Sequence, residues 1–297
     1  MKKLFNKIIS KLTSKDQIKS NHNETKLLLG RILTDINHIK RSKSLKDYEA
    51  KIFSQFGEDG IIDFLIKELD IKKDKFIEIG IENYEESNTR FLLESKNWTG
   101  LIIDSSQKYV DYIKKQNYYW RNNITAKYSF VTEKNINKII KDFTVKDDVG
   151  LLSIDIDGND YWIWKKIENL KPDIVIMEYN ARLGTEKSIS IPYDENFERI
   201  KKHHSSIYFG CSLKALCNLG KVKGYSLVYT NMNGNNAFFI NSQILKNSKS
   251  EIIRETSPEE CFSINSFNEL RDIKGNILER NKESEDEILK NCKFENV

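Results

Sequence analysis

The sequence predicts an α/β fold built on one mostly parallel β-sheet, and two observations support this fold class. Short apolar runs of strand character alternate with segments of helical periodicity, which is the pattern of parallel strands joined by right-handed helical crossovers. Further along the chain, two apolar runs flank the turn sequence NGNN (233–236), which predicts an antiparallel hairpin that closes the sheet.

The expected elements of this α/β domain follow one another between residues 52 and 244. Prolines occur only at positions 172, 192 and 258, outside all of these elements. The predicted strands are 76–80, 100–104, 126–131, 150–157, 173–180, 225–232 and 236–241, and the predicted helices are 61–69, 86–95, 109–116, 134–143 and 213–224.

A basic helical extension is expected before this domain, in residues 1–51. It carries thirteen Lys/Arg and five Asp/Glu, whereas the whole chain of 297 residues has a net charge of only +4. A polar break at 14–23 separates two predicted helices, and Asn21 with Glu24 resembles a capping box for the second one. The first helix is predicted from Leu4, Phe5, Ile8, Ile9 and Leu12, and the second from Leu29, Ile32, Leu33, Ile36 and Ile39.

Two interpretations of the basic extension remain open. A solvated helical extension is favoured over contact with an anionic membrane surface. Its helices could pack on the core or on a second subunit, so a homodimer is an alternative to a monomer. Because residues 1–51 carry a net charge of +8, the rest of the chain carries −4, which is not the pattern of a nucleic-acid-binding protein.

Other sequence features indicate the cellular compartment of the protein and the character of its C-terminal residues. The four cysteines form no CxxC pair, which indicates reduced thiols in the cytoplasm rather than a zinc site. No apolar run approaches the roughly 18 residues that span a bilayer, and no signal peptide is predicted. We therefore expect a cytoplasmic protein, with peripheral contact to the inner membrane as the alternative. Residues 245–297 are polar and are expected to form a C-terminal extension.

Acidic residues close four of the predicted strands. They are Glu78, Asp104, Asp155 with Asp157, and Glu178. The carboxyl ends of parallel strands meet at one edge of an open α/β sheet, where ligands bind, so this edge is the predicted site. Asp104 lies 24 residues after Gly80, where an acid can accept the hydroxyls of a ribose. The alternative for Asp104 is a solvated loop acid.

The loop after the first strand, FIEIGIENY (76–84), has one glycine where a pyrophosphate-binding loop needs several. Glu82, Glu85 and Glu86 place negative charge where a pyrophosphate would lie, which argues against NAD or FAD. S-adenosylmethionine has no phosphate and carries a sulfonium, an ammonium and a carboxylate group. An acidic loop is therefore compatible with the cationic parts of this cofactor.

The segments IDIDGNDYWIWK (154–165) and EYN (178–180) resemble a methyltransferase-like family. This family is related to the FkbM-type S-adenosylmethionine-dependent enzymes and is found in bacterial surface-polysaccharide gene clusters. The resemblance extends over about residues 25–240. It implies a Rossmann-like class I methyltransferase sheet of seven strands, mostly parallel, with the last strand antiparallel.

The resemblance also implies a set of cofactor-binding residues. The methionine moiety is expected near Gln55, Glu58, Glu78 and Gly80, the ribose at Asp104 and Ser105, and the adenine near the segment 123–126, which contains Thr125; Asn83 and Asp155 complete the set. For Gln55 and Glu58 the alternative is a surface turn before the following helix.

The acidic turn at 155–160 has two interpretations. Asp157, Glu178 and Asn180 offer oxygen ligands for Mg²⁺ at neighbouring strand ends. Alternatively, the turn is structural and its side chains accept hydrogen bonds from backbone amides.

A general base is required if the methyl acceptor is a hydroxyl, because the acceptor must lose its proton. His203 is one candidate, since histidine titrates near neutral pH. Asp157 and Glu178 compete with it for this role, and the alternative for His203 is a bland surface histidine.

The sequence therefore predicts an S-adenosylmethionine-dependent methyltransferase that modifies a sugar or sugar substituent in the biosynthesis of capsule or another surface polysaccharide. O-methylation is favoured over N-methylation, and the acceptor is expected to be a small molecule or glycan, with a nucleotide-linked sugar as one form. Two alternatives stay open. One is a non-catalytic binding or assembly protein that retains the fold, and the other is a nucleotide-sugar-modifying enzyme with a different cofactor.

Overall fold

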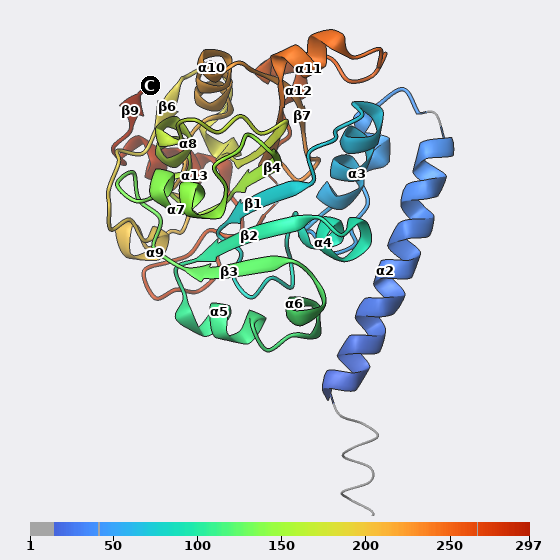
Figure 1. The fold of residues 1–297 in the computed structure, drawn as a ribbon. Helices are drawn as coiled ribbons and strands as arrows, with labels where there is room; N and C mark the ends of the chain where they lie inside the picture. Colours follow the sequence, from blue (N-terminus) through green and yellow to red (C-terminus); the bar gives the residue numbers. More distant parts are fainter. Residues whose placement is uncertain (1–14, 41, 266) are drawn as a thin grey trace, which may run out of the picture.

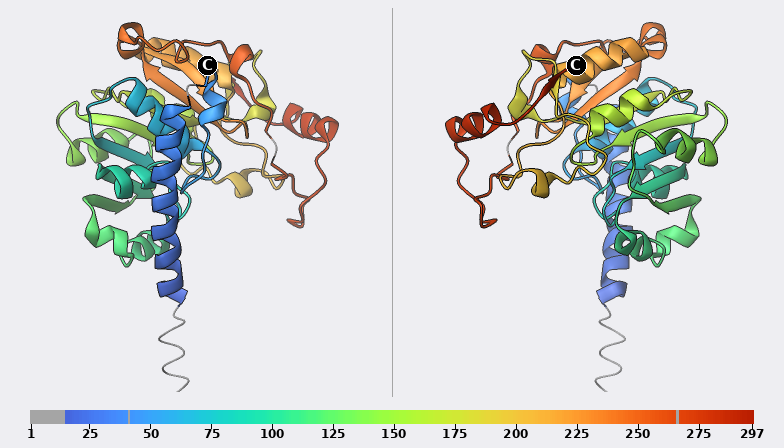
Figure 2. Two further views of the ribbon diagram at one scale, coloured as in Figure 1. Left: turned by 90° about the vertical axis from the view of Figure 1, so that its right-hand side faces the viewer. Right: turned by 90° about the vertical axis from the view of Figure 1, so that its left-hand side faces the viewer.

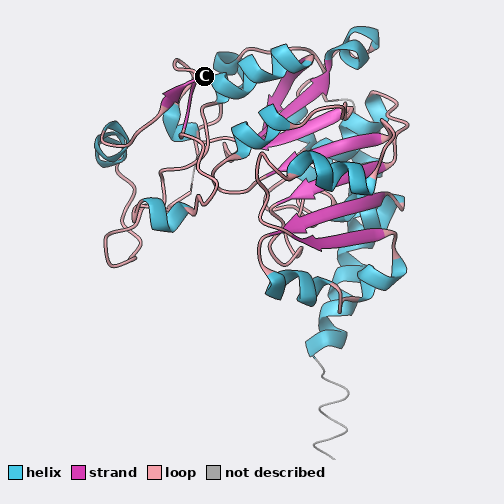
Figure 3. Cartoon of the chain, turned by 60° about the vertical axis from the view of Figure 1, so that its left-hand side comes forward, coloured by secondary structure: helices cyan, strands magenta, loops and turns pink. Residues whose placement is uncertain are grey.

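A seven-stranded sheet organises the molecule, and its strands lie between layers of helices (Figures 1 and 3). The structure, a computed structural model, describes residues 15–40, 42–265 and 267–297. The strand order is β3-β2-β1-β4-β5-β8-β7, and β8 runs antiparallel to both of its neighbours. This topology confirms the predicted class I methyltransferase sheet. The strands are β1 Lys75–Ile79, β2 Thr99–Asp104, β3 Ile124–Tyr128, β4 Val149–Ile154, β5 Ile174–Glu178, β7 Tyr225–Thr230 and β8 Asn236–Asn241.

Helices cover both faces of the sheet, so its central strands are apolar on both sides. Successive side chains of a strand point to opposite faces. Phe76 accordingly packs in the core beneath α3, α4 and α5, whereas Ile77 packs in the core beneath α7, α8 and α10. These helices are α3 Glu58–Glu68, α4 Arg90–Lys96, α5 Gln107–Ile113, α7 Ile136–Phe143, α8 Asp160–Lys166 and α10 Leu213–Lys223. The short helices α6 Asn117–Arg121 and α9 Arg199–Lys202 lie in connections.

The N-terminal part of the described chain is one continuous helix, α2 (Lys15–Ile39), which runs along α3 and α4 (Figures 1 and 2). The predicted polar break and the capping box are therefore wrong, because Asn21 lies inside this helix. The break contains no glycine or proline, and its Lys, Gln and Ser residues tolerate helical geometry. The helix predicted from residues 4–12 lies outside the described residues. Within those residues, no helix is both long and apolar enough to cross a membrane.

Residues 245–297 pack back onto the α/β domain. Strand β9 (Glu295–Asn296) pairs antiparallel with β6 (Ile189–Ser190), which follows β5. The buried Arg182 side chain forms ion pairs with Glu269 and Glu285, each at 3.1 Å. Further elements of this region are α11 Ser242–Asn247, α12 Pro258–Cys261 and α13 Lys282–Lys290. Arg182 thereby ties two parts of the C-terminal extension to the loop after β5.

We expect Arg182→Met to loosen the C-terminal extension, because it leaves the buried Glu285 carboxylate with only the more distant guanidinium of Arg280, at 3.6 Å. Removal of one partner of a buried ion pair costs about 3–5 kcal/mol. Urea denaturation measures the loss, and hydrogen exchange locates it in residues 267–290. Arg254→Met is a matched control, since Arg254 is exposed in the same extension, and it should change stability by less than about 0.5 kcal/mol. Equal stability of the two variants would contradict the proposed role of Arg182.

Candidate functional site

A pocket of about 910 Å³ opens at the carboxyl ends of β1, β2, β4 and β5. Its volume is at the upper end of the range of small-molecule and cofactor sites, roughly 300–1,000 Å³. The strand ends contribute one wall, and the segments 197–201 and 267–271 contribute the other. The pocket therefore lies at the edge of the sheet where the strand-end acids predict a ligand site.

Gly80 sets how closely the ends of β1 and β4 approach each other. Its φ is +82°, and a Cβ atom at this position would lie 1.5 Å from the carbonyl oxygen of Asp155. Both the backbone conformation and the contact exclude other residues. The single glycine of FIEIGIENY is thus the one that the close approach of the two strands requires.

Glu78 holds the loop that leaves β1. One of its carboxylate oxygens accepts a hydrogen bond of 2.8 Å from the Asn88 amide, and the other accepts one of 2.7 Å from the Ser87 hydroxyl. The Thr89 amide and hydroxyl also donate to this second oxygen. Burial raises the pKa of Glu78, and these donors counteract the rise. Glu78 lines the pocket, but its hydrogen bonds serve to close the loop 80–89.

Asp104 is buried rather than a solvated loop acid. Its Oδ2 accepts hydrogen bonds from the Ile81 amide (3.2 Å) and the Glu82 amide (2.8 Å), and its Oδ1 accepts one from the Ser106 amide (2.7 Å). Burial raises the pKa of Asp104, and these amides counteract the rise. Since a carboxylate offers about four acceptor sites, Oδ1 keeps capacity for a ligand hydroxyl. Ser105 lies beside it in the pocket wall.

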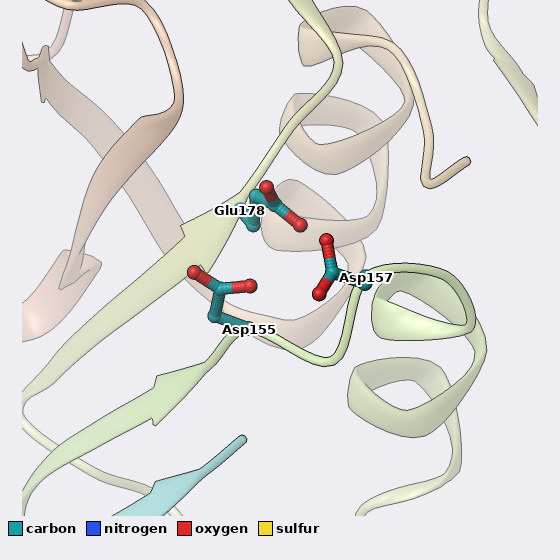
Figure 4. Close-up of side chains that lie close together, drawn as sticks. All are labelled: Asp155, Asp157 and Glu178. Carbon is teal, nitrogen blue, oxygen red and sulfur yellow. The ribbon is translucent and has the colours of Figure 1, made fainter. Parts of the chain in front are cut away.

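Asp155 and Glu178 form a carboxyl pair between the ends of β4 and β5 (Figure 4). Loss of hydration raises the pKa of both groups well above the usual range, and the neighbouring acids raise it further. The pair therefore retains a proton to higher pH than a free carboxylic acid does. Glu178 Oε2 is buried and has no hydrogen-bond partner among the described residues.

Asp157 faces the same space but is paired with a cation. Its backbone is left-handed, with φ of +56°, and its Oδ1 accepts a hydrogen bond of 2.5 Å from Arg199. The Arg199 guanidinium also lies 3.7 Å from the centre of the Phe209 ring and 3.0 Å from Glu269. A positive charge supplied by the chain thus compensates part of the acidic cluster.

The third acid of the turn, Asp160, is structural. Its two oxygens accept hydrogen bonds from the Ile156 amide (2.8 Å) and the Gly158 amide (2.9 Å). Burial raises the pKa of Asp160 to about 6, although these amides counteract the rise. For this residue the hydrogen-bonded turn is the interpretation that the geometry supports.

The predicted Mg²⁺ ligands are not all brought together. Carboxylate oxygens of Asp155, Asp157 and Glu178 lie within 4.8 Å of one another, a spacing that a cation can bridge. Asn180, however, donates to the carbonyl oxygens of residues 207 and 209 and caps the 3-10 helix Ala181–Leu183. It does not line the pocket. The predicted ligand set of Asp157, Glu178 and Asn180 is therefore wrong in Asn180. The carboxylates that do lie together are those of Asp155, Asp157 and Glu178, and Arg199 occupies one side of this cluster.

Three predicted cofactor residues do not line the pocket. Thr125 pairs with Leu101 near the start of β3, at the opposite end of that strand from the pocket. Residues 129–131, after β3, line the pocket instead of 123–126. Asn83 accepts a hydrogen bond from the Glu85 amide within its own turn. Glu58 is fully buried and binds the side-chain amides of Asn231 and Asn236.

His203, the predicted histidine base, also lies outside the pocket wall. Its Nδ1 is 2.6 Å from the Ser205 hydroxyl, and its ring stacks on His204 with centroids 4.5 Å apart. Burial and the neighbouring His204 lower its pKa. Arg199, four residues before His203, contacts the acidic cluster instead of the histidine. Of the predicted site residues, those that line the pocket are Gln55, Glu78, Gly80, Asp104, Ser105, Asp155, Asp157 and Glu178.

The pocket is strongly acidic. Among the described residues that line it, nine are Asp or Glu, whereas three are Lys or Arg. Glu82 and Glu86 belong to this lining, so their negative charge lies where it disfavours a pyrophosphate. Glu85 does not, because it pairs with Lys19 and accepts a hydrogen bond from Tyr112. The acidic lining disfavours phosphate groups and favours cationic or neutral ligands.

No family model and no curated protein matches this chain. Solved structures match its fold at low identity. An O-methyltransferase from Bacillus cereus, in complex with S-adenosylhomocysteine, has 13% identity and a TM-score of 0.43 over 78% of this chain and 98% of its own. A SAM dependent methyltransferase from Aquifex aeolicus has 12% identity and a TM-score of 0.36, over 60% of this chain and 87% of its own. Similarity of this degree carries no conclusion about this chain.

We expect Glu178→Gln to stabilise the protein increasingly as pH rises. A carboxyl group whose folded pKa is raised contributes stability below its ordinary pKa, near 4.5, and this stability is lost as pH rises through the folded value. The variant lacks that loss, which amounts to about 1.4 kcal/mol per unit of pKa difference. Melting temperatures from pH 4 to pH 8 measure the effect, with the exposed Glu251→Gln as control. A constant difference from wild type across this range would rule out a raised pKa at Glu178.

Proposed function

We propose that this protein is an S-adenosylmethionine-dependent methyltransferase whose acceptor is a hydroxyl of a sugar or sugar substituent. The single observation that carries the proposal is the acidic, glycine-poor pocket at the carboxyl ends of β1, β2 and β4. Its loop has one glycine where the strands meet, and glutamates where a pyrophosphate would need backbone amides. A nucleoside cofactor with positive charge and no phosphate suits this lining.

The residues present fit the cofactor in two places. Oδ1 of Asp104 has acceptor capacity left for a ribose hydroxyl, and Ser105 stands beside it. Gly80 lines the pocket beside the end of β4, and the acids of this wall, Glu82 and Asp157 among them, offer negative charge to the cationic groups. When bound, S-adenosylmethionine supplies a methyl group on a sulfonium centre, ready for direct displacement by an oxygen nucleophile.

Glu178 is the proposed base. It lines the pocket, its Oε2 is free of protein hydrogen bonds among the described residues, and its raised pKa makes its carboxylate form a stronger base. Asp155 can share the proton that Glu178 accepts, because the two carboxyl groups are adjacent. Arg199 would stabilise the charge of the acceptor and of Asp157 without a metal ion. Positioning of the acceptor against the sulfonium supplies the remainder of the acceleration.

The acceptor class rests on two supports. The resemblance of residues 154–165 to enzymes of surface-polysaccharide gene clusters favours a sugar. The excess of acids in the pocket favours a neutral glycan or simple sugar over a nucleotide-linked one, whose phosphates would meet Glu82 and Glu86. Capsule or another surface polysaccharide is thus the proposed destination of the product.

Identification of the small molecule released from the purified protein tests the cofactor class. After denaturation and mass spectrometry, we expect S-adenosylmethionine or S-adenosylhomocysteine. A bound dinucleotide would instead favour the enzyme with a different cofactor. Incubation with methyl-labelled cofactor and a panel of sugars then tests transfer, and cofactor binding without transfer to any acceptor would favour the non-catalytic binding protein.

We expect Asp104→Asn to weaken binding of S-adenosylhomocysteine by about 10- to 100-fold, because a hydrogen bond to a charged group contributes about 1.5–3 kcal/mol. Isothermal titration measures the change in Kd. Asp111→Asn is the matched control, since Asp111 is an exposed acid on the neighbouring α5, and its Kd should equal that of wild type. An unchanged Kd for folded Asp104→Asn would remove Asp104 from the cofactor site.

A further inference from the structure

The apolar face of α2 points away from the α/β domain. Figure 2 (left) shows α2 in front of the domain along its length. A surface helix normally buries its apolar stripe against the core. On α2 the large apolar side chains are instead 39–79% exposed, and they are Ile18, Leu28, Leu29, Ile32, Leu33, Ile36 and Ile39.

Apart from Leu27, which packs against a buried cluster of Ile52, Phe53 and Phe91, the side of α2 that faces the domain is small or polar. Gly30 lies against Ile52, where a Cβ atom would come within 2.7 Å of the Ile52 side chain. Thr34 and Asn37 are buried, and His38 Nε2 is 2.7 Å from the Asp63 carboxylate. The helix is therefore held in this orientation by specific contacts, and the apolar stripe is left outside. Exposed apolar stripes of this kind mark interaction surfaces.

The spacing of the apolar residues in this stripe fits pairing with an identical helix. Leu29, Ile32, Ile36 and Ile39 follow the 3-4-3 spacing of the a and d positions in a coiled coil, and Ile18 falls on the same d series. Leu28 and Leu33 flank this seam and widen it. The seam is regular over residues 29–39, whereas its positions 22 and 25 hold His22 and Thr25, and over residues 29–39 it is complementary to a second helix with the same seam.

The charges of α2 argue against a lipid surface as the partner. Helices that lie on membranes present Lys and Arg around their apolar face. Three basic side chains of α2 that the structure describes are instead engaged with the domain: Lys19 with Glu85, Lys26 with the Phe53 ring, and Arg31 with Ser95 and the backbone. They are not available to bind anionic headgroups from the outward face.

We propose that the outward face of α2 binds the same face of a second copy of this chain, in a parallel, two-fold symmetric pair of helices. In that pairing a g position faces the e position of the next heptad on the partner. Leu28 then meets the partner subunit's Leu33, and Asp35 meets the partner subunit's Lys40. One contact is apolar and the other joins opposite charges, and symmetry forms each of them twice.

The test is the mass of the full-length protein in solution, from light scattering after size-exclusion chromatography at micromolar concentration. Wild type should elute as a dimer, and Ile32→Glu/Ile36→Glu should be a monomer with unchanged circular dichroism. Val222→Glu, at an 86% exposed apolar position on α10, is the control and should stay dimeric. A monomeric wild type, or a dimeric double variant, would overturn the proposal. So would a monomeric wild type that floats with anionic phosphatidylserine vesicles, because the stripe would then bind lipid.

Cysteine cross-linking tests the parallel orientation. In protein with Cys261 and Cys292 changed to Ser, Ile36→Cys should form a disulfide-linked dimer on mild oxidation, because identical a positions meet in a parallel pair. Val222→Cys in the same background should remain monomeric on a denaturing gel. Absence of the Ile36→Cys cross-link in a protein that is dimeric in solution would overturn the parallel pairing.

Discussion

The contact between the ends of β1 and β4 is the constraint on which the pocket depends. Gly80 adopts φ of +82° with its Cα against the Asp155 carbonyl, where no side chain fits. This contact allows the chain to turn after β1, so that the amides of residues 81 and 82 reach Asp104. It also fixes the point at which β4 ends, which places Asp155 beside Glu178 on the neighbouring strand. One residue without a side chain thus sets the positions of both the proposed ribose acceptor and the proposed base.

The concentration of acids around this contact is tolerated because each acid is compensated in its own way. Backbone amides bind Asp104 and Asp160, hydroxyl and amide groups bind Glu78, and Arg199 binds Asp157. Oε2 of Glu178 has no such donor among the described residues, and the Asp155–Glu178 pair retains a proton instead. The compensating Arg199 is itself held by Glu269 of the C-terminal extension. The extension therefore contributes part of the pocket wall, through Phe267, Asn268, Glu269 and Arg271.

Local patterns in the sequence were enough to predict the sheet and the acids at its edge. Both depend on the alternation and the ends of strands, which are properties of neighbouring residues. Thr125 was misplaced because it lies near the start of β3, while the residues that reach the pocket follow that strand. Glu58 and Arg199 depend on long-range partners, Asn231 and Asp157, which no local pattern announces. Arg199 in particular stands in a basic run that looks solvated. The continuous α2 was missed because polar residues were interpreted as a break, although none of them ends a helix.

We propose that the pocket accepts the adenosyl nucleoside of S-adenosylmethionine and rejects a pyrophosphate. The most direct measurement is isothermal titration of the wild-type protein with S-adenosylhomocysteine and, under the same conditions, with NAD⁺. We expect saturable binding of S-adenosylhomocysteine at one site per chain and no detectable binding of NAD⁺. Binding of NAD⁺ with no binding of S-adenosylhomocysteine to the folded protein would contradict the claim.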